Sequence, residues 1–82
     1  MYRARVRFPV ELGELLKREL ETAIDQANLG EEDTLIARRY LIDQIPQIDI
    51  AVEIGMERST ISRRLPRILD RVLWAAERMG MT

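Results

Sequence analysis

The apolar residues at the start of the chain follow two successive periods. Residues 2–8 alternate strictly between apolar side chains and arginines, the pattern of a strand with one apolar face. From Pro9 to about Asn28 the apolar residues recur at helical spacing, which predicts an amphipathic helix with Pro9 in its first turn. The apolar stripe of this helix consists of Val10, Leu12, Leu15, Leu16, Leu20, Ala23, Ile24 and Ala27.

A second helix is predicted from about Glu32 to Ile45, after a turn at residues 28–30. The acidic triplet 31–33 suits a helix start, because negative charge complements the helix dipole. The same carboxylates could form a metal or acid-base site, but the chain offers no His and no supporting ligands, so we interpret them as a helix start. Pro46 ends the helix. Its expected buried residues are Leu35, Ile36, Tyr40, Leu41 and Ile45, with Arg38 and Arg39 toward the outer side.

Two short helices are predicted over about 47–54 and 58–65, separated by Gly55, and a final helix over 66–79. The final segment starts with a proline, which lacks an amide hydrogen and would press on the preceding turn. We therefore expect a new helix to begin there. Trp74 lies beside the apolar stripe of this helix, as either a cover on the core or an anchor in a dimer contact. The stripe consists of Ile68, Leu69, Val72, Leu73, Ala76 and Met79.

The segment QIDIAVEIGMERSTISRRL, residues 47–65, has the spacing of a helix-turn-helix. Ala51 is small where the second helix would cross the first, and Gly55 allows the left-handed backbone of a tight turn. The residues expected to fill the wedge between the helices are Ile50, Ile54, Met56, Ile61 and Leu65. Once these are buried, the opposite face of the second helix consists of hydrogen-bonding side chains.

That exposed face fits the width and the chemistry of the DNA major groove. Arg can bond both O6 and N7 of guanine, and Ser can bond bases or phosphates. The residues expected to contact bases are Arg58, Ser59, Ser62 and Arg63. The residues expected to contact the phosphate backbone are Gln47, Thr60, Arg64 and Arg67, together with Arg3, Arg5 and Arg7 of an N-terminal arm.

The stretch RYLIDQIPQIDIAVEIGMERSTISRRL resembles the fourth-region DNA-binding domain of sigma factors and the small sigma-like regulators of phages and mobile elements. The resemblance covers about the second half of the chain and implies a helix-turn-helix fold and DNA binding. It implies base contacts at Arg58, Ser59, Ser62 and Arg63. Arg64 departs from the pattern, because many proteins of this fold have an aliphatic residue there. We do not expect a complete sigma factor, since 82 residues leave no room for promoter melting and core-polymerase binding.

The opening RARVRFPVELGELL is similar, over a short stretch, to the start of ribbon-helix-helix repressors, in which strands of two subunits pair. A lone strand needs a partner for its backbone hydrogen bonds. Residues 1–8 are therefore either a strand paired with that of a second copy or a basic arm on the surface. The expected architecture is mainly α, a compact single domain of four to five helices over residues 9–82, preceded by this short N-terminal β-strand or arm.

The net charge of -1 conceals an uneven distribution. Residues 1–10 carry +3, residues 11–33 carry -6 and residues 34–82 carry +2. Five arginines fall between Arg58 and Arg71, where a DNA-facing helix is expected. The acidic first helix is expected to face away from DNA.

The composition excludes most catalytic and metal sites. The chain has no Cys and no His, and therefore no disulfide, no thiolate nucleophile and neither of the commonest soft metal ligands. Ser59, Thr60 and Ser62 have no His partner for nucleophilic catalysis, so we expect no enzymatic activity, no metal and no cofactor. No apolar run is long enough to cross a bilayer and no signal segment follows the basic start, which predicts a cytoplasmic protein.

These features predict a sequence-specific regulator of transcription that binds double-stranded DNA, a homodimeric repressor of phage or mobile-element type. Dimerisation through the N-terminal strand, the last helix or both would give a palindromic operator, with half-sites about 10 base pairs or a multiple of that apart. The alternative is a protein-interaction module, in which the acidic first helix or the apolar last helix binds RNA polymerase or another nucleoprotein.

Overall fold

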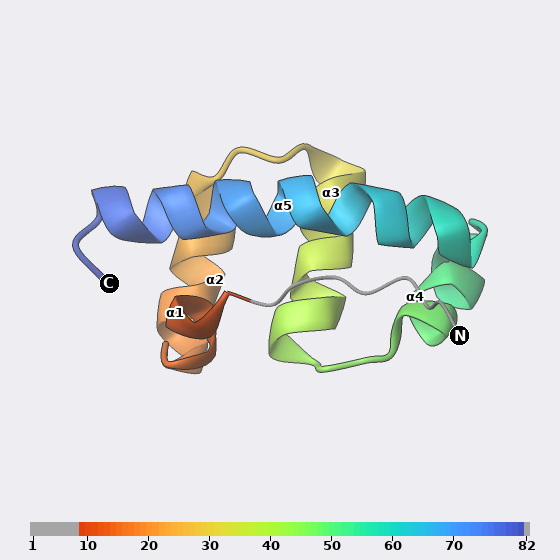
Figure 1. Cartoon of the computed structure of the whole chain (residues 1–82), viewed down its shortest axis with the longest axis horizontal. Coiled ribbons are helices and arrows are strands. Elements are labelled where there is room, and N and C mark those ends of the chain that lie inside the picture. The colour runs from red at the N-terminus through yellow and green to blue at the C-terminus, as the bar shows by residue number, and fades with distance from the viewer. Residues whose placement is uncertain (1–8, 82) are drawn as a thin grey trace.

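A computed structural model of the chain describes residues 9–81, which form helices arranged around one long C-terminal helix (Figure 1). The elements are α1 Val10–Gly13, α2 Lys17–Gln26, α3 Glu31–Ala37, η1 Arg38–Ile42, α4 Gln47–Ile54 and α5 Arg58–Arg78. The predicted mainly helical, compact architecture is confirmed, with a Cα radius of gyration of 12.2 Å. The predicted strand at residues 2–8 lies outside the described residues, and residues 9–81 contain no strand.

The hydrophobic core lies between α5 and the helices beneath it. α2, α3 and α4 follow one another along α5 and each packs against it (Figure 1). The buried residues of α5 recur every three or four positions, so one stripe of this helix meets all three partners. They are Ile61, Leu65, Ile68, Leu69, Val72, Ala75 and Ala76. The remaining core residues are Leu12, Leu20, Ala23, Ile24, Ala27, Ile36, Ala37, Leu41, Ile50 and Ala51. Within residues 9–81, no helix combines the length and the apolar character needed to cross a bilayer.

α5 runs through Pro66 without interruption, so the predicted start of a new helix at this residue is wrong. Pro66 cannot donate a hydrogen bond to the carbonyl oxygen of Ser62, and a proline inside a helix costs about 3 kcal/mol. The flanking residues outweigh this cost, because Leu65 and Ile68 are fully buried and a break would pull them from the core. Pro66 itself is exposed. The predicted reading segment and the predicted last helix are therefore one continuous rod.

The predicted first helix is divided into α1 and α2, so the prediction of one helix to about Asn28 is wrong. Gly13, a poor helix former, is the last residue of α1. The backbone amide of Leu16 donates to Oε1 of Glu19 at 2.8 Å, which caps the start of α2. Val10 and Leu16, expected on the buried stripe, are therefore exposed.

α3 and η1 form one continuous helix whose last turn is wider than an α-helical turn. α3 begins at Glu31, which confirms the interpretation of the acidic triplet as a helix start. In η1 the amide of Asp43 donates to the carbonyl oxygen of Arg38 at 3.1 Å, a spacing of five residues rather than four. The helix ends at Ile42, earlier than predicted, because Gln44 has a φ of 55°. Of the expected core residues, Ile36 and Leu41 are buried and Leu35, Tyr40 and Ile45 are half-buried.

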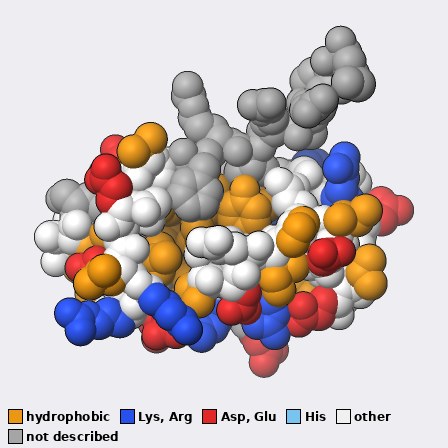
Figure 2. All heavy atoms as spheres, turned by 90° about the horizontal axis from the view of Figure 1, so that it is seen from below, with side chains coloured by type: hydrophobic (Ala, Val, Ile, Leu, Met, Phe, Trp, Pro, Cys, Tyr) orange, Lys and Arg blue, Asp and Glu red, His pale blue; other side chains and the backbone are white. Residues whose placement is uncertain are grey.

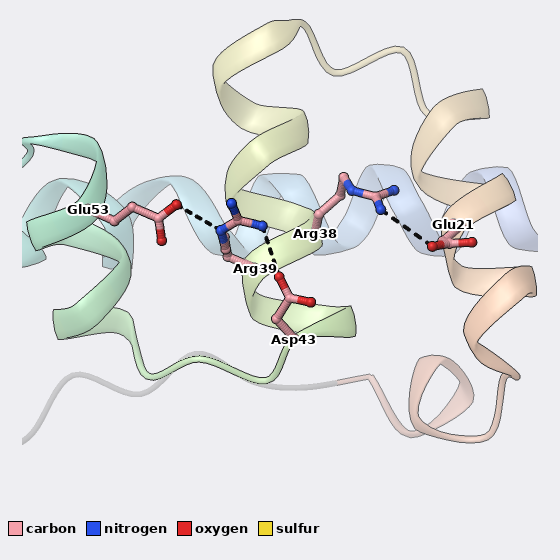
Figure 3. Close-up of polar contacts among 5 residues, drawn as sticks. All are labelled: Glu21, Arg38, Arg39, Asp43 and Glu53. Carbon is pink, nitrogen blue, oxygen red and sulfur yellow. Dashed lines mark hydrogen bonds and ion pairs between the residues drawn. The ribbon is translucent and has the colours of Figure 1, made fainter.

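Two arginines of η1 tie this helix to the helices on either side of it (Figure 3). Arg38 forms an ion pair with Glu21 of α2, with 3.4 Å between the nearest atoms. Arg39 donates from Nε to Glu53 of α4 and from Nη1 to Asp43, at 2.9 Å each. Acceptance of these bonds by Glu53, and secondarily by Asp43, raises the pKa of the Arg39 guanidinium. These polar contacts link α2, η1 and α4 in addition to the apolar core that the three helices share.

Another arginine, Arg64, ties α5 to the start of α3. Its Nη1 donates to Oε1 of Glu32 at 2.6 Å and to Oδ1 of Asp33 at 3.2 Å. These bonds, chiefly the one to Glu32, raise the pKa of the Arg64 guanidinium. Asp33 also lies 3.5 Å from Nη2 of Arg67. The acidic start of α3 therefore has two roles, since it complements the dipole of α3 and neutralises an arginine of α5.

The turn between α4 and α5 depends on the backbone of Gly55, whose φ is 84°. The amides of Gly55 and Met56 both donate to the carbonyl oxygen of Ala51, at 2.9 Å each. This arrangement satisfies a carbonyl at the end of α4, and Met56 packs against the core. The predicted left-handed glycine is confirmed, and its turn sets the direction in which α5 leaves α4.

Replacing Gly55 tests this turn. A Cβ atom at Gly55 would meet open space, so the penalty comes from the backbone conformation alone, which costs an ordinary residue about 1–2 kcal/mol. We expect Gly55→Ala to lower the free energy of unfolding by this amount. Gly55→Asn, the matched control, should lower it less because Asn adopts left-handed backbone more readily. Urea unfolding followed by circular dichroism measures both, and an unchanged Gly55→Ala protein would contradict the left-handed turn.

Replacing Arg64 by Met tests the link between α5 and α3, because Met keeps the apolar stem and removes the charge. We expect a lower melting temperature at low salt and a smaller difference at high salt, since ions screen an exposed pair. The control is Arg67→Met, whose side chain is 72% exposed and should matter much less. Thermal unfolding at several NaCl concentrations measures the effect. Identical curves for Arg64→Met and the parent would mean that the link contributes nothing to stability.

Candidate nucleic-acid interface

The four residues expected to contact DNA bases lie on one side of the first half of α5. Arg58, Ser59 and Arg63 are exposed, and Ser62 is half-buried. Their spacing of three and four residues places them close together on the helix surface. Arg58 lies seven positions before the buried Leu65 and is exposed because it is the first residue of α5. We call Arg58, Ser59, Ser62 and Arg63 the reading face. The structure therefore brings together all four residues that the sequence selects.

The opposite side of this half of α5 is held by the core. Ile61 and Leu65 are fully buried, and α4 packs against this part of the helix. On α4 the residues Ile50 and Ala51 are buried, and Ala51 is only 2% exposed. A larger side chain at Ala51 would have to displace its neighbours, because protein cores are close-packed. The core thus fixes the rotation of α5 that turns the reading face outward.

A hydrogen bond joins the reading face to the start of α4. The hydroxyl of Ser62 donates to Oε1 of Gln47 at 2.6 Å. This bond orients the Gln47 amide and leaves its two Nε2 hydrogens able to donate to a phosphate oxygen. The hydroxyl oxygen of Ser62 can still accept a bond from a base. The sequence selected the two residues separately, and their contact joins the position expected to read bases to the position expected to bind phosphate.

The arginines of α5 divide into two groups. Arg58 and Arg63 are exposed and make no ion pair with another described residue, so their guanidinium groups can bind an external partner. Arg64 is held by Glu32 and Asp33, and its predicted phosphate contact would require breaking these bonds. Arg67 is intermediate, since it is exposed and has only the 3.5 Å contact with Asp33.

The other residues expected to contact phosphates lie beside the reading face or outside the described residues. Thr60 is half-buried, and its backbone amide donates to the carbonyl oxygen of Glu57 at 3.0 Å in the first turn of α5. Its hydroxyl lies beside the reading face rather than on it. Arg3, Arg5 and Arg7 of the predicted arm lie outside the described residues.

Sequence reasoning missed the role of Glu32 and Asp33 as partners of Arg64. The sequence analysis interpreted these acids as a helix start and predicted that Arg64 contacts the phosphate backbone of DNA. The available signal was Arg64 itself, which occupies a position that is often aliphatic in helix-turn-helix proteins and therefore points toward a neighbouring helix. Sequence reasoning also missed the exposure of Ile48 and Val52 on α4. The signal there was the apolar character of α4 on both of its sides.

The reading face carries positive charge without an acidic residue in its own helical turn. The first turn of α5 contains no acid, so the positive end of the helix dipole adds to the charge of Arg58. Glu57 immediately precedes the helix, and Asp70 lies almost two turns beyond Arg63. An anionic partner with hydrogen-bond acceptors therefore fits this face. No protein-family model, curated protein or solved structure matches the chain.

Proposed function

We propose that the protein is a sequence-specific regulator of transcription that binds double-stranded DNA through a helix-turn-helix formed by α4 and the first half of α5. The observation that carries the proposal is the outward reading face, in which Arg58 and Arg63 have no ion pair with a described residue. The tight turn at Gly55 and the buried Ala51 support it, because they allow α5 to cross closely over α4.

The reading face enters the major groove in this proposal. Arg58 and Arg63 bond guanine O6 and N7, and Ser59 and Ser62 bond bases or nearby phosphates. Gln47, at the start of α4, donates to the sugar-phosphate backbone, and its bond to Ser62 sets the register between the two contacts. Because α5 continues through Pro66, Arg67 lies one turn beyond Arg63 and reaches the flanking phosphates.

Repression follows if the operator overlaps a promoter, because the bound protein then occupies the site. The resemblance of residues 39–65 to sigma-like regulators of phages and mobile elements supports a role in transcription. A homodimer on a palindromic operator supplies the second set of contacts that one short reading face lacks. The basic residues Arg3, Arg5 and Arg7 add phosphate contacts.

Protein binding is the second candidate function, and a specific surface favours it. Ile48 and Val52 lie one turn apart on α4 and are 57% and 77% exposed. Figure 2 shows hydrophobic side chains gathered across the face that is lowest in Figure 1, with acidic and basic side chains mixed at its edge. Exposed apolar residues of this kind suit a protein partner such as RNA polymerase better than a phosphate backbone.

Replacing Arg63 by Ala tests base reading. The target is a duplex selected by the parent protein from a random library, and the comparison is a scrambled duplex of the same length. We expect Arg63→Ala to weaken specific binding by about 1–3 kcal/mol and to relax one base preference, with little change on scrambled DNA. Fluorescence polarisation at several salt concentrations measures both affinities. Arg18→Ala, which removes an exposed arginine of α2, is the matched control and should change neither.

Two outcomes would count against the proposal. Equal losses of affinity on selected and scrambled DNA would show that Arg63 contacts phosphates and does not read bases. Failure of the parent protein to bind any duplex, together with binding to RNA polymerase that Val52→Asp abolishes, would favour the protein-binding function.

A further inference from the structure

Two arginines extend the positive charge of α5 beyond the reading face, on the side of the helix toward α3. At about 100° per residue, Arg67 lies about 40° around the helix from Arg63, and Arg64 lies about 100° from it in the same direction. Ser62 lies about 100° from Arg63 in the opposite direction, where it meets Gln47 of α4. The reading face therefore has α4 on one side and the start of α3 on the other.

A helix that lies in the major groove has a sugar-phosphate strand on each side, because the two backbones bound the groove. In the proposed complex, Gln47 contacts the strand on the α4 side. The strand on the α3 side comes near Arg64 and Arg67. Two carboxylates already occupy this side, since Nη1 of Arg64 donates to Glu32 at 2.6 Å and to Asp33 at 3.2 Å. The two acids therefore lie where phosphate oxygens would bind.

We propose that Glu32 and Asp33 withhold Arg64 from DNA and thereby limit how strongly the protein binds the phosphate backbone. The proposal rests on the proposed function and names the residues that set the sequence-independent part of its affinity. Because a phosphate contact does not depend on the bases, the two acids lower the affinity for every duplex by a similar factor. Binding then depends more on the bases that the reading face contacts.

Arg64 keeps its two partners because a phosphate would have to replace both of them. The side chain of Asp33 is only 13% exposed. A carboxylate in such a place is poorly hydrated, so the loss of its cationic partner is costly. A phosphate that approached Arg64 would also be repelled by Glu32 and Asp33. Both effects favour the bonds within the chain over a bond to DNA.

Arg67 differs from Arg64 in each of these respects. Its side chain is 72% exposed, and its contact with Asp33 is 3.5 Å long. Asp33 keeps its bond to Arg64 when Arg67 turns away, so no carboxylate loses its last cationic partner. Arg67 can therefore exchange its contact within the chain for a phosphate at little cost. The acids thus separate two arginines that the sequence analysis placed together on the phosphate backbone.

Replacing both acids by their amides tests the proposal, because Glu32→Gln and Asp33→Asn keep the shape of the side chains and remove their charge. We expect this double variant to bind the selected and the scrambled duplex about five- to tenfold more tightly than the parent. The plot of log affinity against log salt should steepen by about 0.9, the value for one added phosphate contact. Adding Arg64→Met should restore the parent slope and remove most of the gain in affinity. Fluorescence polarisation at several NaCl concentrations measures both quantities.

The matched control is Glu11→Gln with Asp25→Asn, which removes the same two charges at exposed positions of α1 and α2. These helices lie toward the other end of α5 from the reading face (Figure 1). Salt therefore screens their charges from the bound DNA, and we expect neither quantity to change. Circular dichroism establishes that each variant is folded. Glu32→Gln alone removes the shorter bond and should give a smaller gain, which keeps the test usable if the double variant unfolds.

The guanidinium N–H resonances of Arg63 and Arg64 give a direct readout by NMR, and Arg63→Ala and Arg64→Met assign them. In the parent, a duplex should shift the resonance of Arg63 and leave that of Arg64 in place. In the double variant it should shift both. Without DNA, the N–H groups of Arg64 should exchange with water more slowly than those of Arg63, because carboxylates hold them. A parent whose Arg64 resonance shifts together with that of Arg63 would contradict the proposal.

The results separate this proposal from the proposed function. A parent that binds its selected duplex, with a double variant of unchanged affinity and slope, would overturn the withholding of Arg64 and leave DNA binding in place. A gain that survives Arg64→Met would also overturn it, because the acids would then act by repulsion alone. A parent that binds no duplex, with a double variant that binds through Arg64, would support the withholding and reject DNA binding by the parent. If neither protein binds a duplex, both proposals fail.

Discussion

The other helices are stable in this fold because they bury one apolar stripe of α5. α1, α3 and α4 are four, seven and eight residues long, and isolated helices of such lengths are not stable in water. α3 and α4 persist because they pack against the same long helix, as α2 does (Figure 1). A chain of 82 residues has room for a single core. The buried side chains of α5 form the part of this core against which α2, α3 and α4 all pack.

The same stripe determines which side of α5 meets solvent, and the acids then determine which of its arginines are available. Arg64 points sideways toward α3 and is neutralised by Glu32 and Asp33, whereas Arg58 and Arg63 point outward. An overall charge of -1 is therefore compatible with an electropositive reading face. Several of the acids are already committed to arginines within the chain, and they do not surround the reading face.

The sequence-based predictions are accurate where a feature depends on neighbouring residues and wrong where it depends on packing between distant parts of the chain. The bounds of α4 were predicted residue for residue, because Pro46 and Gly55 act within one turn of the backbone. The helix start at Glu31 is equally local. The predictions at Pro66 and within residues 9–28 are wrong because both depend on packing. The core holds α5 together through a proline, while the bond between Leu16 and Glu19 starts a new helix where periodicity alone favours a continuous one.

Hydrophobic spacing alone predicts the helical class and the α4–α5 pair, because it fixes which side of each helix is buried. The side-chain contacts between helices depend on how the helices pack. Packing brings Ser62 within hydrogen-bond distance of Gln47, and it brings Arg64 within hydrogen-bond distance of Glu32 in α3. It also joined two predicted helices into one, so Trp74 and the reading face lie on the same helix. These features arise from contacts between residues 15 to 32 positions apart, or from the core as a whole, and no local pattern encodes them.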